Sequence, residues 1–146
     1  MTILDNNIRY LQIAFNYNVG MVLGTLPKIV QDPRILIEAG TPFIKREGTR
    51  GIATIARMWR GHVVADLKTS DGAVGEVDLA RTAGATAATV IGNCPVETLD
   101  LFIERCQALN MISMIDMLGV DDPLRVMRPL SRPPDVVVIH RGRDEE

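Results

Sequence analysis

The sequence predicts an α/β fold of the (β/α)8 TIM-barrel type, shortened to about six strand–helix units. Two observations support this prediction: short apolar runs recur at an almost constant spacing, and most of them end in a polar residue. The chain has 146 residues, of which 47% are hydrophobic, and this size suits one domain with a real core. We therefore expect residues 1–146 to form a single, partial TIM-barrel domain.

Six apolar runs have the length and composition of buried parallel strands. Their starts lie about 25 residues apart, which is close to the smallest length that holds one strand, one helix and two short loops. The runs cover residues 11–16, 35–40, 62–68, 87–92, 111–116 and 135–140.

The segments between these runs carry helix signals. In segment 95–109, Pro95 suits the first helical position, and Val96, Leu99 and Ile103 fall on one face. Further helices are predicted over 47–60, over 72–83 and from residue 121 or 122 onward. Alternating units of this kind build either an open doubly wound sheet or a closed barrel.

The polar strand ends favour the barrel. Polar groups gathered from several strand ends are typical of a barrel's catalytic face, whereas a nucleotide-binding open sheet concentrates them near one glycine-rich loop. No GxGxxG or Walker-type phosphate loop occurs in the chain. The polar residues at the strand ends are Asn16, Glu38, Asp66, Lys68, Asp116 and His140.

The charge balance argues against a polyanionic partner. The chain has 16 Lys and Arg against 18 Asp and Glu, with a pI near 5.7, so a small metabolite is favoured over nucleic acid. The first ten residues lack the apolar stretch of a secretory signal or a membrane span. We expect a cytoplasmic protein that binds neither nucleic acid nor membranes.

The segment from Asp66 to Asp71 holds the most informative residues. Asp66 and Lys68 lie two positions apart at a strand end, so both face the same side of the sheet, which in a barrel is the lumen. Each charge there lowers the cost of burying the other. From this spacing alone a plain structural ion pair and a catalytic pair both stay open.

Three motifs resemble one family. Residues 66–71 (DLKTSD) resemble the DxKxxD signature of the orotidine 5'-phosphate decarboxylase superfamily. Residues 38–45 (EAGTPFIK) resemble the E-x-G-T-P-L-I-K of its hexulose-6-phosphate synthases, and residues 140–144 (HRGRD) resemble the H-x-G-x-D that follows the sixth strand. The resemblance covers most of the chain.

The resemblance implies roles for the candidate residues. Glu38 and Asp66 would hold Mg²⁺ or Mn²⁺, and hard divalent cations do prefer carboxylate oxygens and water. Lys68 would stabilise an enediolate, and His140 would move the proton, because histidine is the only residue type whose unperturbed side chain titrates near neutrality. Asp71 resembles the residue that reaches a neighbouring subunit's site, which implies a homodimer.

The implied reaction is a magnesium-dependent lyase or aldolase step that joins ribulose 5-phosphate and formaldehyde. Asn16, Glu38, Lys45 and Arg143 would bind the sugar phosphate. Arg143 also resembles a residue of the 3-keto-L-gulonate-6-phosphate decarboxylases, so a decarboxylase of a sugar-acid phosphate or of orotidine 5'-phosphate is the alternative. A truncated, non-catalytic paralogue that acts as an interaction protein is the further alternative.

Some features depart from the family pattern or have other interpretations. Asn16 stands where the family has an aspartate, and a closed barrel of eight units needs about 200 residues, with phosphate-binding loops after its seventh and eighth strands. Glu38 could instead pair with Lys45 or Arg46. Asp116 could be a site residue or an ordinary turn former.

Overall fold

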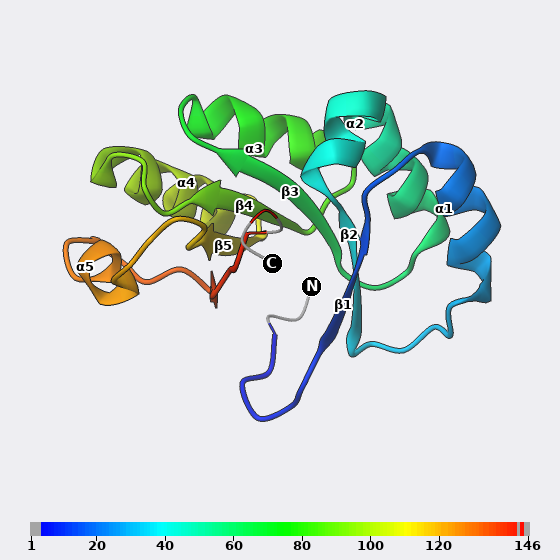
Figure 1. Cartoon of the computed structure of the whole chain (residues 1–146), viewed down its shortest axis with the longest axis horizontal. Coiled ribbons are helices and arrows are strands. Elements are labelled where there is room, and N and C mark those ends of the chain that lie inside the picture. Colours follow the sequence, from blue (N-terminus) through cyan, green and yellow to red (C-terminus); the bar gives the residue numbers. More distant parts are fainter. Residues whose placement is uncertain (1–3, 143, 145–146) are drawn as a thin grey trace.

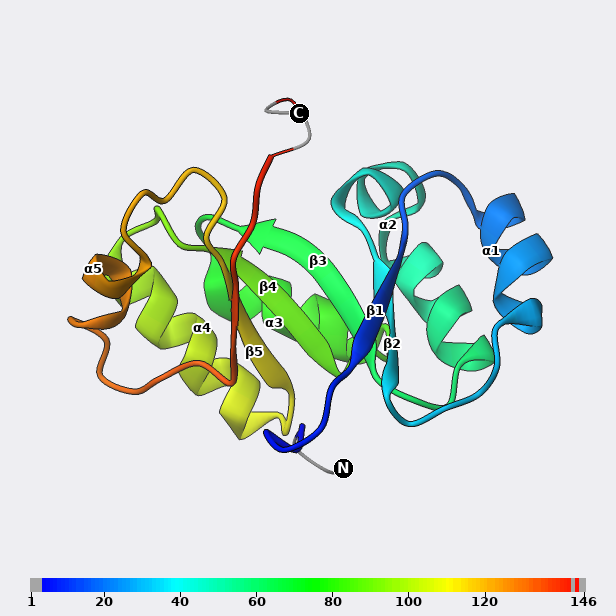
Figure 2. The same ribbon diagram turned by 60° about the horizontal axis from the view of Figure 1, so that its bottom comes forward.

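Six parallel strands form one curved sheet, and the order of the strands follows the chain. The structure is a computed structural model that describes residues 4–142 and 144. The sheet bends into a half-barrel with α1 to α4 on its convex side (Figures 1 and 2). This confirms the predicted barrel type with six units. The strands are β1 (Leu11–Phe15), β2 (Ile35–Ala39), β3 (Val63–Thr69), β4 (Ala87–Ile91), β5 (Ile112–Asp116) and β6 (Val136–Val138).

A helix connects each strand to the next. The helices are α1 (Val19–Thr25), followed by a 3-10 turn (Leu26–Lys28), then α2 (Thr41–Met58), α3 (Ala73–Thr82), α4 (Val96–Ala108) and α5 (Pro123–Met127). The predicted helices 72–83 and 95–109 agree with α3 and α4 to within two residues at each end. Among the described residues, no helix combines the length and the apolar character needed to cross a bilayer.

Helix α2 differs most from the prediction, which began at residue 47. It begins at Thr41 because Pro42, in the first turn, suits a position where no backbone N–H is needed. Gly48 then interrupts it with a φ of 62° and a ψ of −156°, a conformation that is almost restricted to glycine. The first half of α2 is therefore a separate helical segment next to the end of β2.

Two layers of apolar side chains bury both faces of the sheet. The convex face packs against the helices through fully buried residues such as Ile37, Phe43, Phe102 and Ile115. Burial on both faces explains why the strands read as continuous apolar runs. On the concave face a second cluster consists of Leu36, Val64, Ala87, Ile112 and Met114, with Leu4 and Tyr10 packed against it.

The sheet has open edges at β1 and β6. Leu11 at the start of β1 is 57% exposed, and Ile139 just after β6 is 78% exposed. A closed barrel has no such edges, because its last strand pairs with its first. The described residues thus build the part of a barrel that carries strands one to six.

Candidate functional site

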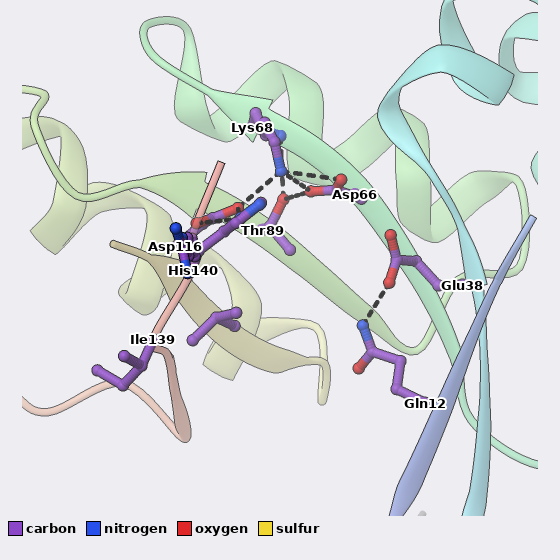
Figure 3. Close-up of a pocket in the computed structure, with 10 residues that line it drawn as sticks. Gln12, Glu38, Asp66, Lys68, Thr89, Asp116, Ile139 and His140 are labelled. Carbon is purple, nitrogen blue, oxygen red and sulfur yellow. Dashed lines mark hydrogen bonds and ion pairs between the residues drawn. The ribbon is translucent and has the colours of Figure 1, made fainter. Parts of the chain in front are cut away.

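A cavity lies at the carboxyl ends of the strands, on the concave side of the sheet. It has two lobes of about 240 and 470 Å³, and both lobes are lined by Glu38, Asp66, Lys68 and His140. Figure 3 shows these side chains converging from β2, β3 and the segment after β6. We call this space the carboxyl-end cavity.

A β-bulge places Asp66 and Lys68 in the cavity. Strand β3 pairs with β4 at Ala65 and again at Thr69, but β4 has fewer residues than β3 between the two pairs. The extra residues of β3 leave the regular ladder, and Lys68 has a φ of 46°. Bulges re-aim side chains in this way, and here the Asp66 and Lys68 side chains meet above the sheet.

The Lys68 ammonium lies between two carboxylates. Its Nζ is 3.0 Å from Oδ2 of Asp66 and 2.6 Å from Oδ2 of Asp116. Burial alone would lower the pKa of Lys68, but the hydrogen bond to Asp116 and the charge of Asp66 outweigh it, so the pKa is raised above its ordinary value. Lys68 therefore stays a cation at neutral pH.

Two threonine hydroxyls orient the Asp66 carboxylate. Thr41, the first residue of α2, donates to Oδ2 over 2.7 Å, and Thr89 of β4 donates to Oδ1 over 2.7 Å. Both carboxylate oxygens also accept from Lys68 Nζ. Asp66 is thus held in one orientation by three different elements.

Asp116 joins Lys68 to His140. It is 2% exposed, and both of its carboxylate oxygens lie 2.9 Å from His140 Nδ1. Burial would raise the pKa of Asp116, yet the hydrogen bonds from Lys68 and His140 lower it below its ordinary value. An ionised carboxylate only accepts hydrogen bonds, so Nδ1 of His140 is the donor in this contact, and in the neutral imidazole Nε2 is the proton acceptor.

Glu38 occupies the β2 side of the cavity. Its carboxylate accepts a hydrogen bond from Gln12 of β1 at 2.6 Å. This partner differs from Lys45 and Arg46, the two ion-pair partners that the sequence suggested. Burial raises the pKa of Glu38, and the negative charges of Asp66 and Asp116 add to this effect.

The donor chemistry around Glu38 fits a hard cation. A bound divalent cation would relieve the repulsion between Glu38 and Asp66, and magnesium sites often use one or two carboxylates plus water. Among the described residues, however, no group of three or more His, Cys, Asp or Glu side chains gathers as a ligand set. Any such ion would complete its coordination with water or substrate oxygens.

Asn16 lines the larger lobe of the cavity, just beyond β1. Gly40 makes room for it, because a Cβ atom at Gly40 would lie 2.0 Å from Oδ1 of Asn16. The glycine between Glu38 and Thr41 is therefore required by the close approach of Asn16.

Two other predicted residues lie apart from the cavity lining. Lys45 is exposed on α2, and Asp71 is exposed in the loop after β3, where its carboxylate accepts from the Gly72 N–H over 2.8 Å. Neither contributes to the lining of the two lobes. Arg143 lies outside the described residues.

Comparison with known proteins gives the family. The model of the "Orotidine 5'-phosphate decarboxylase / HUMPS family" matches residues 22–146. The chain belongs to this family. A "Bifunctional enzyme Fae/Hps" of Methanocaldococcus jannaschii is 40% identical over 141 residues, which are 94% of this chain and 36% of that protein. The corresponding protein of Methanothrix thermoacetophila is 41% identical over 139 residues, with the same coverage.

A solved family member has the same arrangement of strands and helices. The 3-hexulose-6-phosphate synthase of Salmonella typhimurium superposes with a TM-score of 0.86 at 32% identity, over 93% of this chain and 65% of that one. The 3-keto-L-gulonate-6-phosphate decarboxylase of Vibrio cholerae, at 22% identity and a TM-score of 0.76, shares the fold. The chain thus spans about a third of the length of the bifunctional relatives and about two thirds of this synthase.

The structure adds residues to those that the family motifs had indicated. Asp116 connects Lys68 to His140, and its position at a strand end was the one signal in the sequence. Thr89 and Gln12 lie inside strands, where no local pattern distinguishes them from packing residues. The second acidic residue of the DxKxxD motif of this family, Asp71, stays outside the cavity.

Proposed function

We propose that this chain is the strand-one-to-six part of a magnesium-dependent lyase of the hexulose-6-phosphate synthase type, which joins ribulose 5-phosphate and formaldehyde. The observation that carries the proposal is the network in which Asp116 binds both Lys68 and His140. This network places a fixed cation beside a histidine with a free proton acceptor. The 32% identity to a hexulose-6-phosphate synthase over almost the whole chain supports the same reaction.

The reaction begins with a proton transfer. His140 Nε2 takes a proton from C1 of the sugar, the hydroxyl-bearing carbon next to the carbonyl group, and an enediolate forms. The Lys68 ammonium has three N–H groups: with one shared between the two Asp66 oxygens and one on Asp116, the third can donate to an enediolate oxygen. The enediolate carbon then attacks formaldehyde, and the resulting alkoxide takes up a proton.

Glu38 and Asp66 are the residues that would hold magnesium. When bound, the ion would supply positive charge to the oxygens of the enediolate. Gln12 keeps the Glu38 carboxylate at its place in the cavity, and the two threonines do the same for Asp66. The protein therefore presents two oriented carboxylates before any ion arrives.

Substrate binding would also use residues outside the Lys68 network. Asn16, which lines the larger lobe, would bind a substrate hydroxyl, and we assign a substrate-binding role to Lys45 and Arg143 as well. In barrels of this type the phosphate binds at loops after strands seven and eight. The active unit is proposed to be a homodimer in which Asp71 reaches the neighbouring site, so a monomer at micromolar concentration in analytical ultracentrifugation would contradict this part.

The reaction is tested directly with 13C-labelled formaldehyde. The chain is incubated with ribulose 5-phosphate and Mg²⁺, and the new carbon–carbon bond is followed by 13C NMR. We expect product formation that Lys68→Ala lowers by about 100-fold or more. Lys28→Ala, which changes an exposed lysine that does not line the cavity, should leave the rate unchanged. A folded wild-type chain that binds Mg²⁺ and forms no product would contradict the synthase proposal.

The metal site is tested separately by Mn²⁺ binding, measured by electron paramagnetic resonance. Glu38→Gln should abolish the binding because it removes a charged ligand. Glu97→Gln, in the exposed first turn of α4, is the matched control and should bind as the wild type does. Equal binding by both variants would show that Glu38 is not a ligand.

A further inference from the structure

Thr89, in the middle of β4, forms hydrogen bonds to both ends of the Asp66–Lys68 segment. Its hydroxyl accepts from the backbone N–H of Lys68 over 2.9 Å and donates to Oδ1 of Asp66 over 2.7 Å. The residue is 4% exposed, so no water competes freely for these bonds. A single hydroxyl group thus connects the backbone of one cavity residue to the side chain of another (Figure 3).

We propose that Thr89 is a positioning residue: its hydroxyl holds Lys68 in a left-handed backbone conformation and Asp66 in the orientation that meets the Lys68 ammonium. The consequence for catalysis rests on the function proposed above. The positioning itself is a property of the folded chain and does not depend on it.

The bulge in β3 explains why such a hydroxyl is needed. Between the pairs Ala65–Ala88 and Thr69–Val90 the regular ladder is interrupted. The Lys68 N–H therefore donates its hydrogen bond to the Thr89 hydroxyl oxygen in place of a β4 carbonyl. Because a φ of 46° is unfavourable for a residue with a Cβ atom, this bond stabilises a conformation that Lys68 would otherwise leave.

The position of the ammonium depends on that conformation. Lys68 Nζ fits between Asp66 and Asp116 at 3.0 and 2.6 Å only while the backbone directs the side chain into the cavity. If the Thr89 hydroxyl is removed, Lys68 can return to an extended conformation and its ammonium moves away from the two carboxylates.

Thr86 provides a matched control at the other end of the same strand pair. Its hydroxyl also accepts a hydrogen bond from the backbone of β3, namely from the Val63 N–H over 3.0 Å. The residue is similarly buried, at 6% exposed. It does not line the carboxyl-end cavity. Thr86→Val therefore removes a comparable buried hydroxyl without touching Lys68.

The test follows the backbone conformation of Lys68 by NMR. The chain has three lysines, Lys28, Lys45 and Lys68, so the backbone signals of 13C,15N-labelled lysine can be assigned by single substitutions. In Thr89→Val the three-bond HN–Hα coupling of Lys68 should rise toward the value of an extended residue, because its φ of 46° leaves the left-handed region, while the couplings of Lys28 and Lys45 stay unchanged. Thr89→Ser should restore the wild-type coupling of Lys68, and Thr86→Val should not alter it.

A Lys68 HN–Hα coupling in Thr89→Val equal to the wild-type value would overturn the proposal. If Thr89→Val does not fold, Thr89→Cys takes its place, because a thiol is a weaker donor and acceptor, and the same outcomes apply. In the synthase assay, Thr89→Val should lower kcat by about 100-fold with little change in KM. A changed Lys68 coupling in Thr89→Val, found together with a wild-type chain that has no synthase activity, would refute the proposed function and leave this positioning role intact.

Discussion

Replacing Asp116 by asparagine tests the central network of the cavity. The carboxylate accepts from three donors: Lys68 Nζ at 2.6 Å, His140 Nδ1 at 2.9 Å and the Leu118 N–H at 3.0 Å. An asparagine has nearly the same shape but only one acceptor oxygen and no charge. At least one of the three donors must then face the amide NH2 group.

The expected loss of stability follows from these contacts. A hydrogen bond to a charged group contributes about 1.5–3 kcal/mol, and breaking a fully buried ion pair costs about 3–5 kcal/mol. The Asp116 side chain is 3% exposed but that of Lys68 is 22% exposed, so water compensates part of the loss. We expect Asp116→Asn to lower the free energy of unfolding by about 2–3 kcal/mol, which for a chain of this size lowers Tm by about 5–10 °C.

Urea unfolding at neutral pH, followed by circular dichroism, measures this loss. Asp78→Asn is the matched control, because Asp78 also pairs with a cation, Arg105, but at the surface, and its midpoint should hardly change. Since the pKa of Asp116 is lowered on folding, the ionised carboxylate stabilises the folded chain at any pH above its ordinary pKa of 3.8. This stabilisation is lost as the pH falls through the folded pKa. An unfolding midpoint of Asp116→Asn equal to that of the wild type at neutral pH would refute the reasoning.

Three further changes test other parts of the structure. Because the pKa of Glu38 is raised in the folded chain, ionising this carboxyl costs stability as the pH rises from its ordinary pKa of 4.5 through the folded value. In metal-free buffer, Glu38→Gln should therefore have a higher urea midpoint than the wild type at about pH 8 but not at about pH 4. Equal midpoints at the higher pH would contradict this. Gly40→Ala should destabilise the chain by about 1–3 kcal/mol and shift the NMR signals of the Asn16 side-chain amide, because the new Cβ displaces that side chain; unchanged Asn16 signals would show that the contact is absent. Phe102→Ala should lower the free energy of unfolding by about 3–5 kcal/mol in urea, because the ring is fully buried. Leu101→Ala is the control at the half-exposed neighbouring position, and an equally large loss there would show that burial does not decide the cost.

The regular parts of the fold could be predicted from the sequence. Apolar runs of strand length at a constant spacing located all six strands, and the run 87–92 differs from β4 (Ala87–Ile91) by one residue. Caps and helix-stopping residues located α3 and α4 in the same way. These signals are local, because a strand buried on both faces and an amphipathic helix each leave their pattern in consecutive residues.

The irregular parts could not be predicted. The bulge that turns Lys68 into the cavity depends on a mismatch between two strands and has no signature within β3 itself. The start of α2 at Thr41 has a local signal in Pro42, but the kink at Gly48 could not be predicted, because a glycine can also lie within an unbroken helix. In such places tertiary contacts, more than local preference, select the conformation.

By itself, the sequence determined the family, the parallel strands and the presence of Asp66, Lys68 and His140 at strand ends. Only the tertiary structure decided which polar groups meet: it placed Asp116 between Lys68 and His140, paired Glu38 with Gln12, and left Asp71 outside the cavity. The physical reason is that hydrogen bonds and ion pairs act over about 3 Å, and distances on that scale between different strands depend on the curvature and register of the whole sheet.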